Sequence, residues 1–356
     1  MTVPQQSVEL VPDAAGDAAV RVQWDALVSA GLPSLARHPS ASNRPHVTVV
    51  AAPLVDPAQD EVAALARALA GPGAEHVKLL VCGEAAIAAA RRRLAGVANI
   101  EIVAGEFGDV WLRDTGPIFT APGEAAAFTF NGWGGKYDLP GDDTVANQIA
   151  ASSGAALTRH PFVLEGGALD HDGAGTVLTT SQCLLNPNRN RNWREASAEA
   201  ALAASVGARK VIWLGNGLVN DHTDGHVDNL ARFVAPGVVA CPIAFGLDDP
   251  NADTYDAAAR VLAGSTDAEG RRLRLVRVPS PGKMLDAEGN RAPASHMNFL
   301  IANQAVIVPT YGGLAGSFAV QALEEVFPDR KVIGLPSAAL LTGGGSFHCI
   351  SQQEPA

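Results

Sequence analysis

The strongest constraint on the fold of this chain is a regular alternation of strand-like and helix-like segments along most of its length. Five helical patterns recur at intervals of roughly 50–85 residues, and two or three short apolar strands precede each one. The predicted helices lie near residues 60, 144, 195, 254 and 316. This spacing is too wide for a short solenoid repeat. It fits an α/β fold, built either as strand-strand-helix modules around one centre or as a conventional three-layer domain, and the pattern alone leaves both open.

The first 45 residues lack this regularity. Residues 1–45 contain scattered prolines and the run Ser-Ala-Ser-Asn, with one helical pattern near 22–29. An apolar strand over 46–53 ends at Pro53, and a helix over 60–71 follows it. We therefore expect an irregular N-terminal extension over 1–45 and a single domain over 46–356.

Composition narrows the class of protein. Apolar residues make up 47% of the 356 residues and charged residues 18%, which is enough apolar material for a large core. The net charge of −11 disfavours a nucleic-acid partner, which normally requires a basic face, and is compatible with a small cationic substrate. No apolar run approaches the ~20 residues of a membrane span, and the N-terminus lacks a signal-peptide pattern. We expect a cytoplasmic protein without a membrane partner, and self-association into a homo-oligomer stays open.

The cysteines and glycines exclude two further classes. The four cysteines lie far apart without a CxxC pair, so the sequence predicts neither a zinc ribbon nor a disulfide framework. We expect most of these thiols to be buried as small apolar side chains. There is no GxxxxGKS/T or GxGxxG pattern, and the glycines at 343–345 precede neither a helix nor a lysine. A nucleotide-dependent enzyme is therefore a poor candidate.

Four segments concentrate the polar residues of this apolar chain, and the first covers residues 105–119. Asp109, Trp111, Arg113 and Asp114 lie on one run that ends in a Thr-Gly-Pro turn. In an extended strand, Asp109, Trp111 and Arg113 share one face, and Asp114 lies opposite. The run is either a strand end with a surface Arg–Asp pair or a slot for a planar cation, in which a tryptophan lies between two carboxylates.

The second segment, residues 164–176, places a carboxylate beside two glycines. Glu165 follows an apolar strand, and the glycines after it let a ligand approach the backbone closely. The string Asp-His-Asp-Gly at 170–173 resembles the start of a calcium loop, but Ala174 offers no side-chain oxygen and no glutamate closes the loop. We interpret 170–173 as a β-hairpin turn and keep Glu165 as the candidate site residue.

The third segment, residues 220–233, contains two histidines four positions apart. On a helix, His222 and His226 share a face, where a metal site is conceivable. Gly225 and the Asn/Asp-rich start disfavour a helix, and a clear third and fourth ligand is missing, so we expect no metal. In a strand, His226 and Asp228 point the same way, as a base and a carboxylate that face one substrate do.

The fourth segment, residues 341–353, carries Cys349 close to the C-terminus, after three glycines and directly after His348. A nucleophilic thiolate needs close substrate approach and a pKa below the usual ~8.5, whereas a structural cysteine rarely needs three glycines beside it. Cys349 alone stays open between a nucleophile and a core residue. His348 is not the expected base, because neighbours on a strand point to opposite faces.

Together these segments offer one cysteine, a histidine paired with an aspartate, and two further carboxylates. A serine-type acyl-transfer site does not need so many acids, whereas a substrate with a planar positive charge does. Carboxylates can hold the two NH₂ edges of a guanidinium and leave its central carbon open to a thiolate. The residues that predict this chemistry are Cys349, His226, Asp228, Asp114 and Glu165.

Longer strings around these residues carry a family resemblance. They run in order from about residue 105 to the end: WLRDTGPIF (111–119), FNGWGGKYD (130–138), FVLEGGALDHDGAGTVLTTSQCLLNPNRN (162–190), NDHTDGHVDNLARF (220–233), NFLIANQAVIVPTYG (298–312), FPDRKVIGL (327–335) and GGGSFHCISQQ (343–353). In these strings the chain resembles the agmatine deiminases and the nearby bacterial peptidylarginine deiminases, within the pentein superfamily of guanidine-modifying enzymes.

The resemblance implies a fold and an activity. The fold is a pentein-type five-bladed α/β propeller of strand-strand-helix modules with pseudo-fivefold symmetry, in which residues 46–356 form one catalytic domain. The activity is hydrolysis of agmatine to N-carbamoylputrescine and ammonia, as in putrescine and polyamine biosynthesis, through a covalent thiouronium intermediate. The resemblance implies no metal and no organic cofactor.

The resemblance also assigns roles to residues. Asp114 and Asp228 correspond to the carboxylates that hold the guanidinium, and Cys349 corresponds to the nucleophile. His226, supported by Glu165, corresponds to the acid and base. We further expect five residues to line the substrate pocket: Trp111, Asp109, Asp224, Gly344 and Gly345.

The chain departs from the family pattern where the far end of the substrate is recognised. The tryptophans expected around 46–53 are missing, and different residues replace the usual ones at four positions: His222, His296, Gly313 and Ser346. Another guanidino compound, arginine or peptidylarginine therefore stays an alternative substrate, and an amidinotransferase stays an alternative reaction. A His/Asp metal-dependent hydrolase and a non-catalytic guanidino-binding protein are the rival classes.

Overall fold

The computed structural model describes residues 9–10, 47–48, 56–286 and 289–355. The chain divides into two compact units, Met1–Gln59 and Asp60–Ala356. In the first unit, β1 (Glu9–Leu10) pairs antiparallel with β2 (Val47–Thr48). The helix predicted near 22–29 and most of the strand predicted over 46–53 lie outside the described residues.

The larger unit repeats one topology. In four of its sheets, two strands that are adjacent in the chain pair antiparallel, and a third strand then pairs parallel with the second. A parallel return requires a crossover connection, which a helix usually supplies. In chain order the sheets contain β5 (Ile118–Ala121), β6 (Glu124–Thr129) and β7 (Ala156–Val163); β8 (Asp170–His171), β9 (Thr176–Thr179) and β10 (Lys210–Trp213); β11 (Arg232–Ala235), β12 (Val238–Ile243) and β13 (Arg274–Pro279); and β14 (Leu300–Ile301), β15 (Ala305–Thr310) and β16 (Lys331–Pro336).

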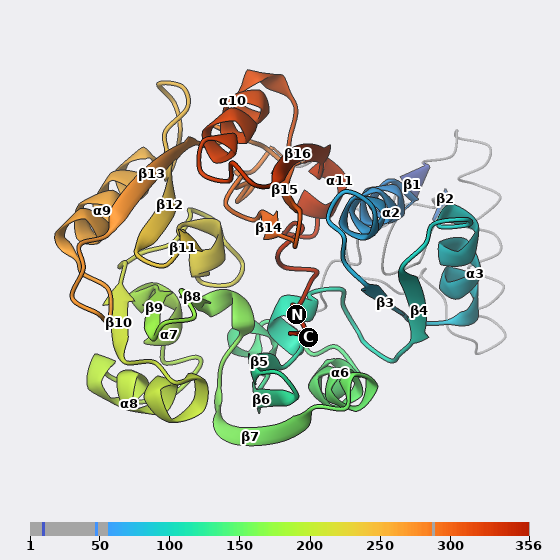
Figure 1. The fold of residues 1–356 in the computed structure, drawn as a ribbon, viewed down its shortest axis with the longest axis horizontal. Helices are drawn as coiled ribbons and strands as arrows, with labels where there is room; N and C mark the ends of the chain where they lie inside the picture. Colours follow the sequence, from blue (N-terminus) through green and yellow to red (C-terminus); the bar gives the residue numbers. More distant parts are fainter. Residues whose placement is uncertain (1–8, 11–46, 49–55, 287–288, 356) are drawn as a thin grey trace, which may run out of the picture. The chain divides into compact units, whose positions relative to one another are not determined.

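A shorter sheet precedes these four. Its strands β3 (Val77–Val81) and β4 (Ile100–Ala104) pair parallel on either side of α3 (Glu84–Arg93), and α2 (Asp56–Ala70) comes before them. The crossover helices of the other sheets are α6 (Val145–Ser153), α8 (Glu195–Val206), α9 (Ala252–Gly264) and α10 (Gly313–Glu324). Within the larger unit, the sheets follow one another in chain order around a common centre, and the crossover helices lie on their outer side (Figure 1).

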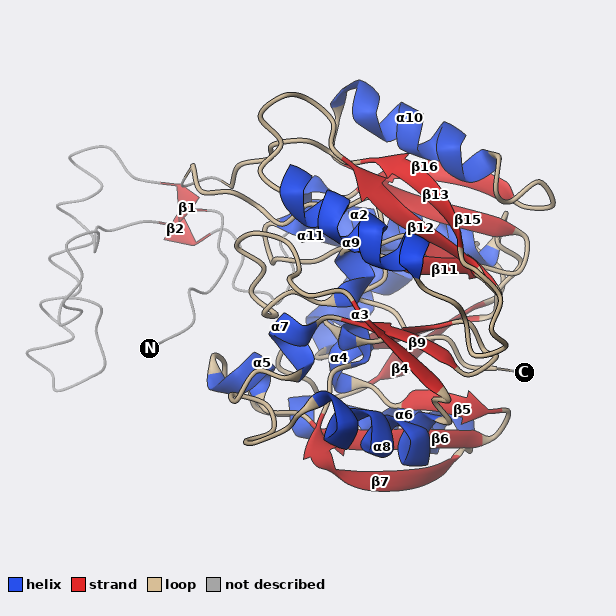
Figure 2. Ribbon diagram, turned by 90° about the vertical axis from the view of Figure 1, so that its left-hand side faces the viewer, coloured by secondary structure: helices blue, strands red, loops and turns tan. Residues whose placement is uncertain are grey.

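The crossover helices bury one apolar face against the sheets. In α9, Tyr255, Ala258 and Leu262 recur at helical spacing and share a buried cluster with Val239 and Cys241 of β12. In the same way α10 contacts β13, β15 and β16, and Figure 2 shows it lying along this side of the larger unit. The apolar core is therefore divided among the sheets, and the polar loops at the centre remain free to form a site.

The structure confirms the helices that the sequence pattern predicted near 60–71, 144–153, 195–206, 254–264 and 316–326, with boundaries that differ by a few residues. Their apolar spacing and their capping glycines are local signals, so sequence alone suffices to find them. The predicted β-hairpin is confirmed, because β8 and β9 pair antiparallel, but its turn covers 172–175 and not 170–173, since Asp170 and His171 form β8. In the described part of the chain, no helix has both the length and the apolar character that a membrane span requires.

Short helical turns replace two predicted strands. The residues after Trp111 form α4 (Leu112–Thr115), and Thr115 closes it by donating from its N–H and its hydroxyl to the carbonyl of Trp111, both at 3.2 Å. The residues after His226 form the 3₁₀ turn η4 (Val227–Asn229), in which the N–H of Leu230 donates to Val227 at 2.8 Å. The extended alternation predicted for these two segments is therefore wrong, because Asp, Asn and Thr favour such local hydrogen bonds over a strand.

Further short turns complete the element order. They are α5 (Gly132–Gly135), η2 (Asp142–Thr144), η3 (Gly166–Ala168), α7 (Ser181–Leu184) and α11 (Ala338–Leu341). The segment around Cys349 is also a turn and not a strand, since the N–H of Ile350 donates to Ser346 and that of Ser351 to His348. Turns of this kind aim neighbouring side chains in directions that the alternation of a strand would not allow.

Candidate active site

Four predicted site residues come from separate elements and meet in one buried cluster. Asp114 lies on α4, His226 and Asp228 lie at η4, and Cys349 lies in the C-terminal turn. Cys349 Sγ is 3.6 Å from Asp228 Oδ2, and His226 Nδ1 is 3.6 Å from Asp114 Oδ1. None of the four is more than 6% exposed, so the charges among them interact with little screening by water.

Asn298, a residue that the sequence patterns did not single out, holds the cysteine in place. Its Nδ2 donates to Cys349 Sγ at 3.1 Å, and its Oδ1 accepts from the backbone N–H groups of Cys349 at 3.2 Å and His348 at 2.9 Å. The N–H of Arg113 donates to the Cys349 carbonyl at 2.9 Å. Because Asn298 is fully buried, one side-chain amide fixes both the sulfur and the backbone of Cys349.

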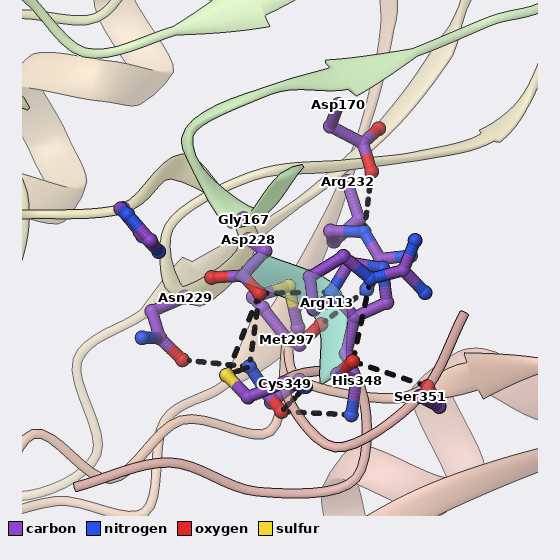
Figure 3. A network of polar contacts seen from close by, with 12 residues as sticks. Arg113, Gly167, Asp170, Asp228, Asn229, Arg232, Met297, His348, Cys349 and Ser351 are labelled. Carbon is purple, nitrogen blue, oxygen red and sulfur yellow. Dashed lines mark hydrogen bonds and ion pairs between the residues drawn. The ribbon is translucent and has the colours of Figure 1, made fainter. Parts of the chain in front are cut away.

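His348 and Cys349 converge on the same carboxylate. His348 Nδ1 lies 2.8 Å from Asp228 Oδ2, the oxygen that also accepts from the Cys349 thiol (Figure 3). The expectation that the two neighbours point to opposite faces is wrong, because they lie in a turn. Burial raises the pKa of Asp228 to about 7, against an opposing effect of Arg232. Burial, followed by the charges of Asp228 and Asp114, raises the pKa of Cys349 well above its usual 9.0.

Asp114 is held by neutral donors. Trp133 Nε1 donates to its Oδ2 and the N–H of Gly167 donates to its Oδ1, both at 3.0 Å. A Cβ at Gly167 would lie 2.5 Å from His226 Nδ1 and 2.8 Å from Asp114 Oδ1, so only glycine lets these two side chains approach each other here. Burial, and then the charges of Asp228 and Glu165, raise the pKa of Asp114 well above 3.8.

His226 is fully buried, and neither ring nitrogen has a hydrogen-bond partner among the described residues. Burial and the positive charge of Arg189 hold its pKa well below 6.5. The imidazole is therefore neutral near pH 7, with one nitrogen free to accept a proton. The expected support from Glu165 is not a hydrogen bond, although a Glu165 oxygen and a His226 nitrogen lie within 4.8 Å of each other.

Glu165 and Asp224 share a buried arginine. Arg189 Nε donates to Glu165 Oε1 at 2.7 Å, and Arg189 Nη1 donates to Asp224 Oδ2 at 2.6 Å. Burial outweighs Arg189 and raises the pKa of Glu165. Burial also acts to raise the pKa of Asp224, but hydrogen bonds from Lys136, Asn188 and Arg189 lower it overall. Asp224, predicted to bind substrate, is thus already occupied by partners within the chain.

Trp111 forms a wall beside the cysteine. It packs in one apolar cluster with Trp133 and Cys349. A Cβ at Gly343 would lie 2.7 Å from the Trp111 ring, and one at Gly345 would lie 2.5 Å from it, so the glycine run lets the ring lie flat against the backbone. This contact explains two of the three glycines before Cys349 as packing requirements.

Asp109 and Gly344, which were also predicted to line the pocket, contact other parts of the chain. Asp109 accepts from the N–H of Val110 at 2.7 Å, and burial raises its pKa to about 6. Gly344 has a φ of +96° and faces His222, whose Nδ1 lies 2.9 Å from the hydroxyl of Tyr137. The role of these residues at the substrate stays a prediction.

Sequence reasoning missed four residues that position the site: Asn298, Arg189, Trp133 and His348. Arg189 is 6% exposed, yet its spacing in the chain does not distinguish it from a surface arginine. Trp133 carries the clearest signal, because glycines flank it on both sides and its own φ is +54°, an unusual value for a bulky residue. A tryptophan between glycines is therefore the sequence signal that indicates Trp133 as a site residue.

The histidines predicted as alternative metal ligands do not come together. Among the described residues, the three-ligand group whose atoms lie within 4.8 Å of one another contains Glu165, Cys183 and His226. His222 and Asp228 are not part of it. The chemistry that the site can perform is set instead by a thiol, a neutral imidazole and two carboxylates of raised pKa, which together suit a planar cationic substrate.

Comparison with known proteins agrees with this chemistry. An agmatine deiminase of Stutzerimonas stutzeri is 38% identical over 327 residues, which cover 84% of this chain and 88% of that protein. A solved structure of an agmatine deiminase of Enterococcus faecalis catalysing its reaction is 34% identical, covers 84% of this chain and 88% of that one, and has a TM-score of 0.78. A C. jejuni agmatine deiminase variant with substrate bound is 28% identical, covers 80% and 85%, and has a TM-score of 0.70.

The α/β fold described above is thus shared with solved deiminases. A family model, described as Porphyromonas-type peptidyl-arginine deiminase, matches residues 43–355. This match includes every segment that contributes to the buried cluster. The chain belongs to the family of the Porphyromonas-type peptidyl-arginine deiminases.

Proposed function

We propose that this chain is an agmatine deiminase, which hydrolyses agmatine to N-carbamoylputrescine and ammonia. The observation that carries the proposal is a pair of buried carboxylates near a thiol: Asp114 and Asp228 have no ion pair with lysine or arginine among the described residues. A guanidinium is a planar cation that can supply the missing positive charge. The identity to agmatine deiminases supports the choice of agmatine within this class.

Substrate binding activates the nucleophile. The charges of Asp228 and Asp114 help to keep the pKa of Cys349 high, so the cysteine is a neutral thiol in the unliganded site. A bound guanidinium neutralises these charges and lowers the pKa of the thiol. The reactive thiolate then forms when substrate is present, and the nucleophile is protected from other electrophiles when substrate is absent.

The reaction then proceeds in two halves. The thiol proton passes to the neutral imidazole of His226, and Cys349 Sγ bonds to the central guanidinium carbon while a C–N π-bond becomes a lone pair. His226 returns the proton to the departing NH₂ group, which leaves as ammonia and gives an S-alkylthiouronium. Water then adds to this carbon and gives a proton to His226. The C–S bond breaks, the sulfur takes the hydroxyl proton of the collapsing adduct, and His226 gives its proton to the released ammonia, so the thiol, the neutral imidazole, the ureido product and ammonium remain.

This mechanism needs no metal and no organic cofactor, because the clamped guanidinium is itself the electrophile. Asp114 and Asp228 hold the cation, and Trp133 and Gly167 fix Asp114 through their hydrogen bonds. Glu165 supports the protonated form of His226 through its negative charge, since an oxygen of Glu165 and a ring nitrogen of His226 lie within 4.8 Å of each other. Trp111 shapes the apolar side of the pocket.

We also propose the finer description of the fold. The β3–β4 sheet and the four three-stranded sheets act as the five blades of a pentein propeller, and the cysteine lies at the centre of this arrangement. An extension over 1–45 before a catalytic domain over 46–356, a cytoplasmic location, a place in putrescine synthesis and self-association into a homo-oligomer are further parts of the proposal. Light scattering of the purified chain measures the last of these.

A deiminase of arginine, peptidylarginine or another guanidino compound is the second candidate. The observation that favours it is His296, which stands where the family usually has tyrosine. It is 2% exposed, stacks on Tyr311 with ring centroids 5.9 Å apart, and holds Pro279 through Nδ1 at 2.8 Å. By the family resemblance this position belongs to the region that recognises the far end of the substrate, so a different residue here favours a different guanidino substrate.

One screen separates these candidates. Ammonia and ureido products are measured with agmatine, free arginine, guanidino acids and an arginine-containing peptide, with and without an acceptor amine. We expect agmatine to give the highest kcat/KM, release of ammonia without the amine, and no turnover by Cys349→Ser. A folded wild-type chain that turns over none of the substrates contradicts the substrate class, and full activity in Cys349→Ala contradicts the mechanism. Activity that chelation removes favours the metal-dependent alternative.

A further inference from the structure

We propose that Glu165, Cys183 and His226 form a buried Zn²⁺ site, and that its occupation inhibits the enzyme. The first observation is their proximity. A carboxylate oxygen, a sulfur and a ring nitrogen, one from each residue, all lie within 4.8 Å of one another. A zinc ion binds such atoms at about 2.0–2.3 Å, so ligands of one ion lie within about 4 Å of each other, and only a small side-chain adjustment is required.

The three ligands come from different elements. Glu165 precedes η3, Cys183 lies on α7, and His226 begins η4, so the fold and not local sequence brings them together. All three are at most 1% exposed. This explains why the spacing of cysteines and histidines in the sequence did not reveal the group.

The second observation is the unsatisfied imidazole. Both ring nitrogens of His226 are buried without a hydrogen-bond partner among the described residues, whereas buried polar atoms nearly always have one. Proton transfer to the substrate uses one nitrogen at a time. The other nitrogen still lacks a partner, and a metal ion supplies one.

The donor set suits zinc. Sulfur, imidazole and carboxylate are its usual ligands, and three protein ligands leave a fourth position for water. Arg189 Nε holds Glu165 Oε1 at 2.7 Å, which orients the carboxylate as outer partners of metal ligands do. The positive charge of Arg189 is already balanced by Asp224 at 2.6 Å. On binding, the Cys183 thiol releases its proton to solvent as the S–Zn bond forms, and the thiolate and carboxylate charges neutralise the ion.

Inhibition follows from the shared histidine, and this part rests on the proposed function. A neutral imidazole has one ring lone pair available, so a zinc ion bound to either nitrogen of His226 leaves none to accept the thiol proton. It also adds positive charge beside Asp114, 3.6 Å from His226, which opposes binding of a guanidinium. Cys183 itself has no part in the proposed deimination, so it can be changed without removing a catalytic group.

The binding test uses the full chain with Cys349→Ser, which removes the reactive thiol as a competing ligand. Co²⁺ is added as a spectroscopic probe and Zn²⁺ is titrated against a chromophoric chelator. We expect stoichiometric binding and a sulfur-to-cobalt charge-transfer band. Adding Cys183→Ser removes the band and weakens binding by about 10–100-fold or more. The matched control is Cys241→Ser, which changes another fully buried thiol outside the group and keeps both signals.

The outcomes are distinct. A missing band, or a band that persists without Cys183, overturns the site. If the Cys183 variants do not unfold cooperatively, X-ray absorption of the zinc-loaded wild-type chain answers the same question, and a zinc environment without sulfur overturns the site. These readouts do not depend on any enzymatic activity, so they fail or succeed separately from the proposed function.

The inhibition test compares the wild-type chain with Cys183→Ser. We expect Zn²⁺ to suppress ammonia release by wild type, a chelator to restore it, and Cys183→Ser to keep its metal-free rate and resist Zn²⁺ by at least about tenfold. Equal inhibition of both proteins means that zinc acts through Cys349, and this overturns the proposal. If zinc binds at Cys183 but does not inhibit the enzyme, the proposed inhibition is overturned and the proposed site is not.

Discussion

The site buries carboxylates in two regions, and the two regions treat them in opposite ways. Around Arg189, Glu165 and Asp224 each contact a guanidinium of the chain itself, at 2.7 and 2.6 Å. Around Cys349, the described residues offer Asp114 and Asp228 only neutral donors and two histidines as direct partners. The first region carries a cation that is ion-paired with its carboxylates. In the second region Arg113 and Arg232 lower the pKa of Asp228 through their charges, but neither forms an ion pair with Asp114 or Asp228 among the described residues, so a substrate cation can take that place.

The pKa values follow this difference for Asp224 but not for Glu165, whose pKa burial raises in spite of Arg189. Hydrogen bonds lower the pKa of Asp224 although burial opposes them, whereas burial raises that of Asp228 to about 7 and that of Asp114 well above its usual value. Carboxylates that prefer to be protonated destabilise the folded chain at neutral pH when they ionise. The region around Cys349 therefore gives up stability for function, as active sites commonly do.

We expect the largest effect, a loss of folding stability, from a substitution that removes the cation of the first region. Arg189→Met leaves Glu165 buried without its partner, and we expect the free energy of unfolding to fall by about 3–5 kcal/mol in urea. Guanidinium chloride is unsuitable because it is itself a ligand candidate. The double variant with Glu165→Gln should recover much of the loss. A stable Arg189→Met would show that the two regions do not differ in this way.

The next effect concerns the second region. Asp114→Asn and Asp228→Asn keep the shape of each side chain but remove its charge, so we expect kcat/KM for the guanidino substrate to fall by about 10²–10³-fold with stability unchanged or raised. The matched control is Asp249→Asn, which changes a buried carboxylate bonded to Ser280 and the backbone of Asn251. If the control loses as much activity, the effect is one of packing and not of charge.

Sequence predicted this comparison only in part. Crossover helices such as Ala252–Gly264 were found because amphipathic spacing is local, and Cys349, His226 and the carboxylates were found because their chemistry is unusual in an apolar chain. Arg189 and Asn298 were not found. Arg189 neutralises two acids, and the amide of Asn298 forms hydrogen bonds with a cysteine. Only these tertiary contacts distinguish the two residues from surface residues of the same type.

The turns were missed for a related reason. The segments that carry Asp114, Asp228 and Cys349 were predicted as strands from their alternation, yet each folds into a turn closed by local hydrogen bonds. Their conformation depends on the sheets around them as much as on their own residues. The resemblance of the strings identified the right residues without revealing this geometry.

A smaller effect comes from Asn298, which contacts both the Cys349 thiol and Asp228 within the second region. Asn298→Ala removes the donor at 3.1 Å from Cys349 Sγ, and loss of a hydrogen bond to a charged group corresponds to about 1.5–3 kcal/mol, or roughly 10–100-fold in kcat/KM. The pH profile of Cys349 alkylation should move to higher pH. Asn298→Asp keeps the acceptor for both backbone N–H groups but adds a negative charge, so it should move the profile further. An unmoved profile in both variants would limit Asn298 to a structural role.

The last expected effect is a dependence of stability on pH that comes from Asp228 in the second region. Between the unfolded pKa of Asp228, 3.8, and its folded value of about 7, the folded chain holds a proton that the unfolded chain has released. Stability from this group is therefore full below pH 3.8 and falls as pH rises, with a slope of up to about 1.4 kcal/mol per unit. Asp228→Asn should flatten this slope in urea unfolding between pH 4.5 and 7, whereas Asp224→Asn should not, because the pKa of Asp224 is shifted downward. If the free energy of unfolding falls with pH equally steeply in wild type and in Asp228→Asn, the slope comes from other groups. The contrast between the two regions is then wrong.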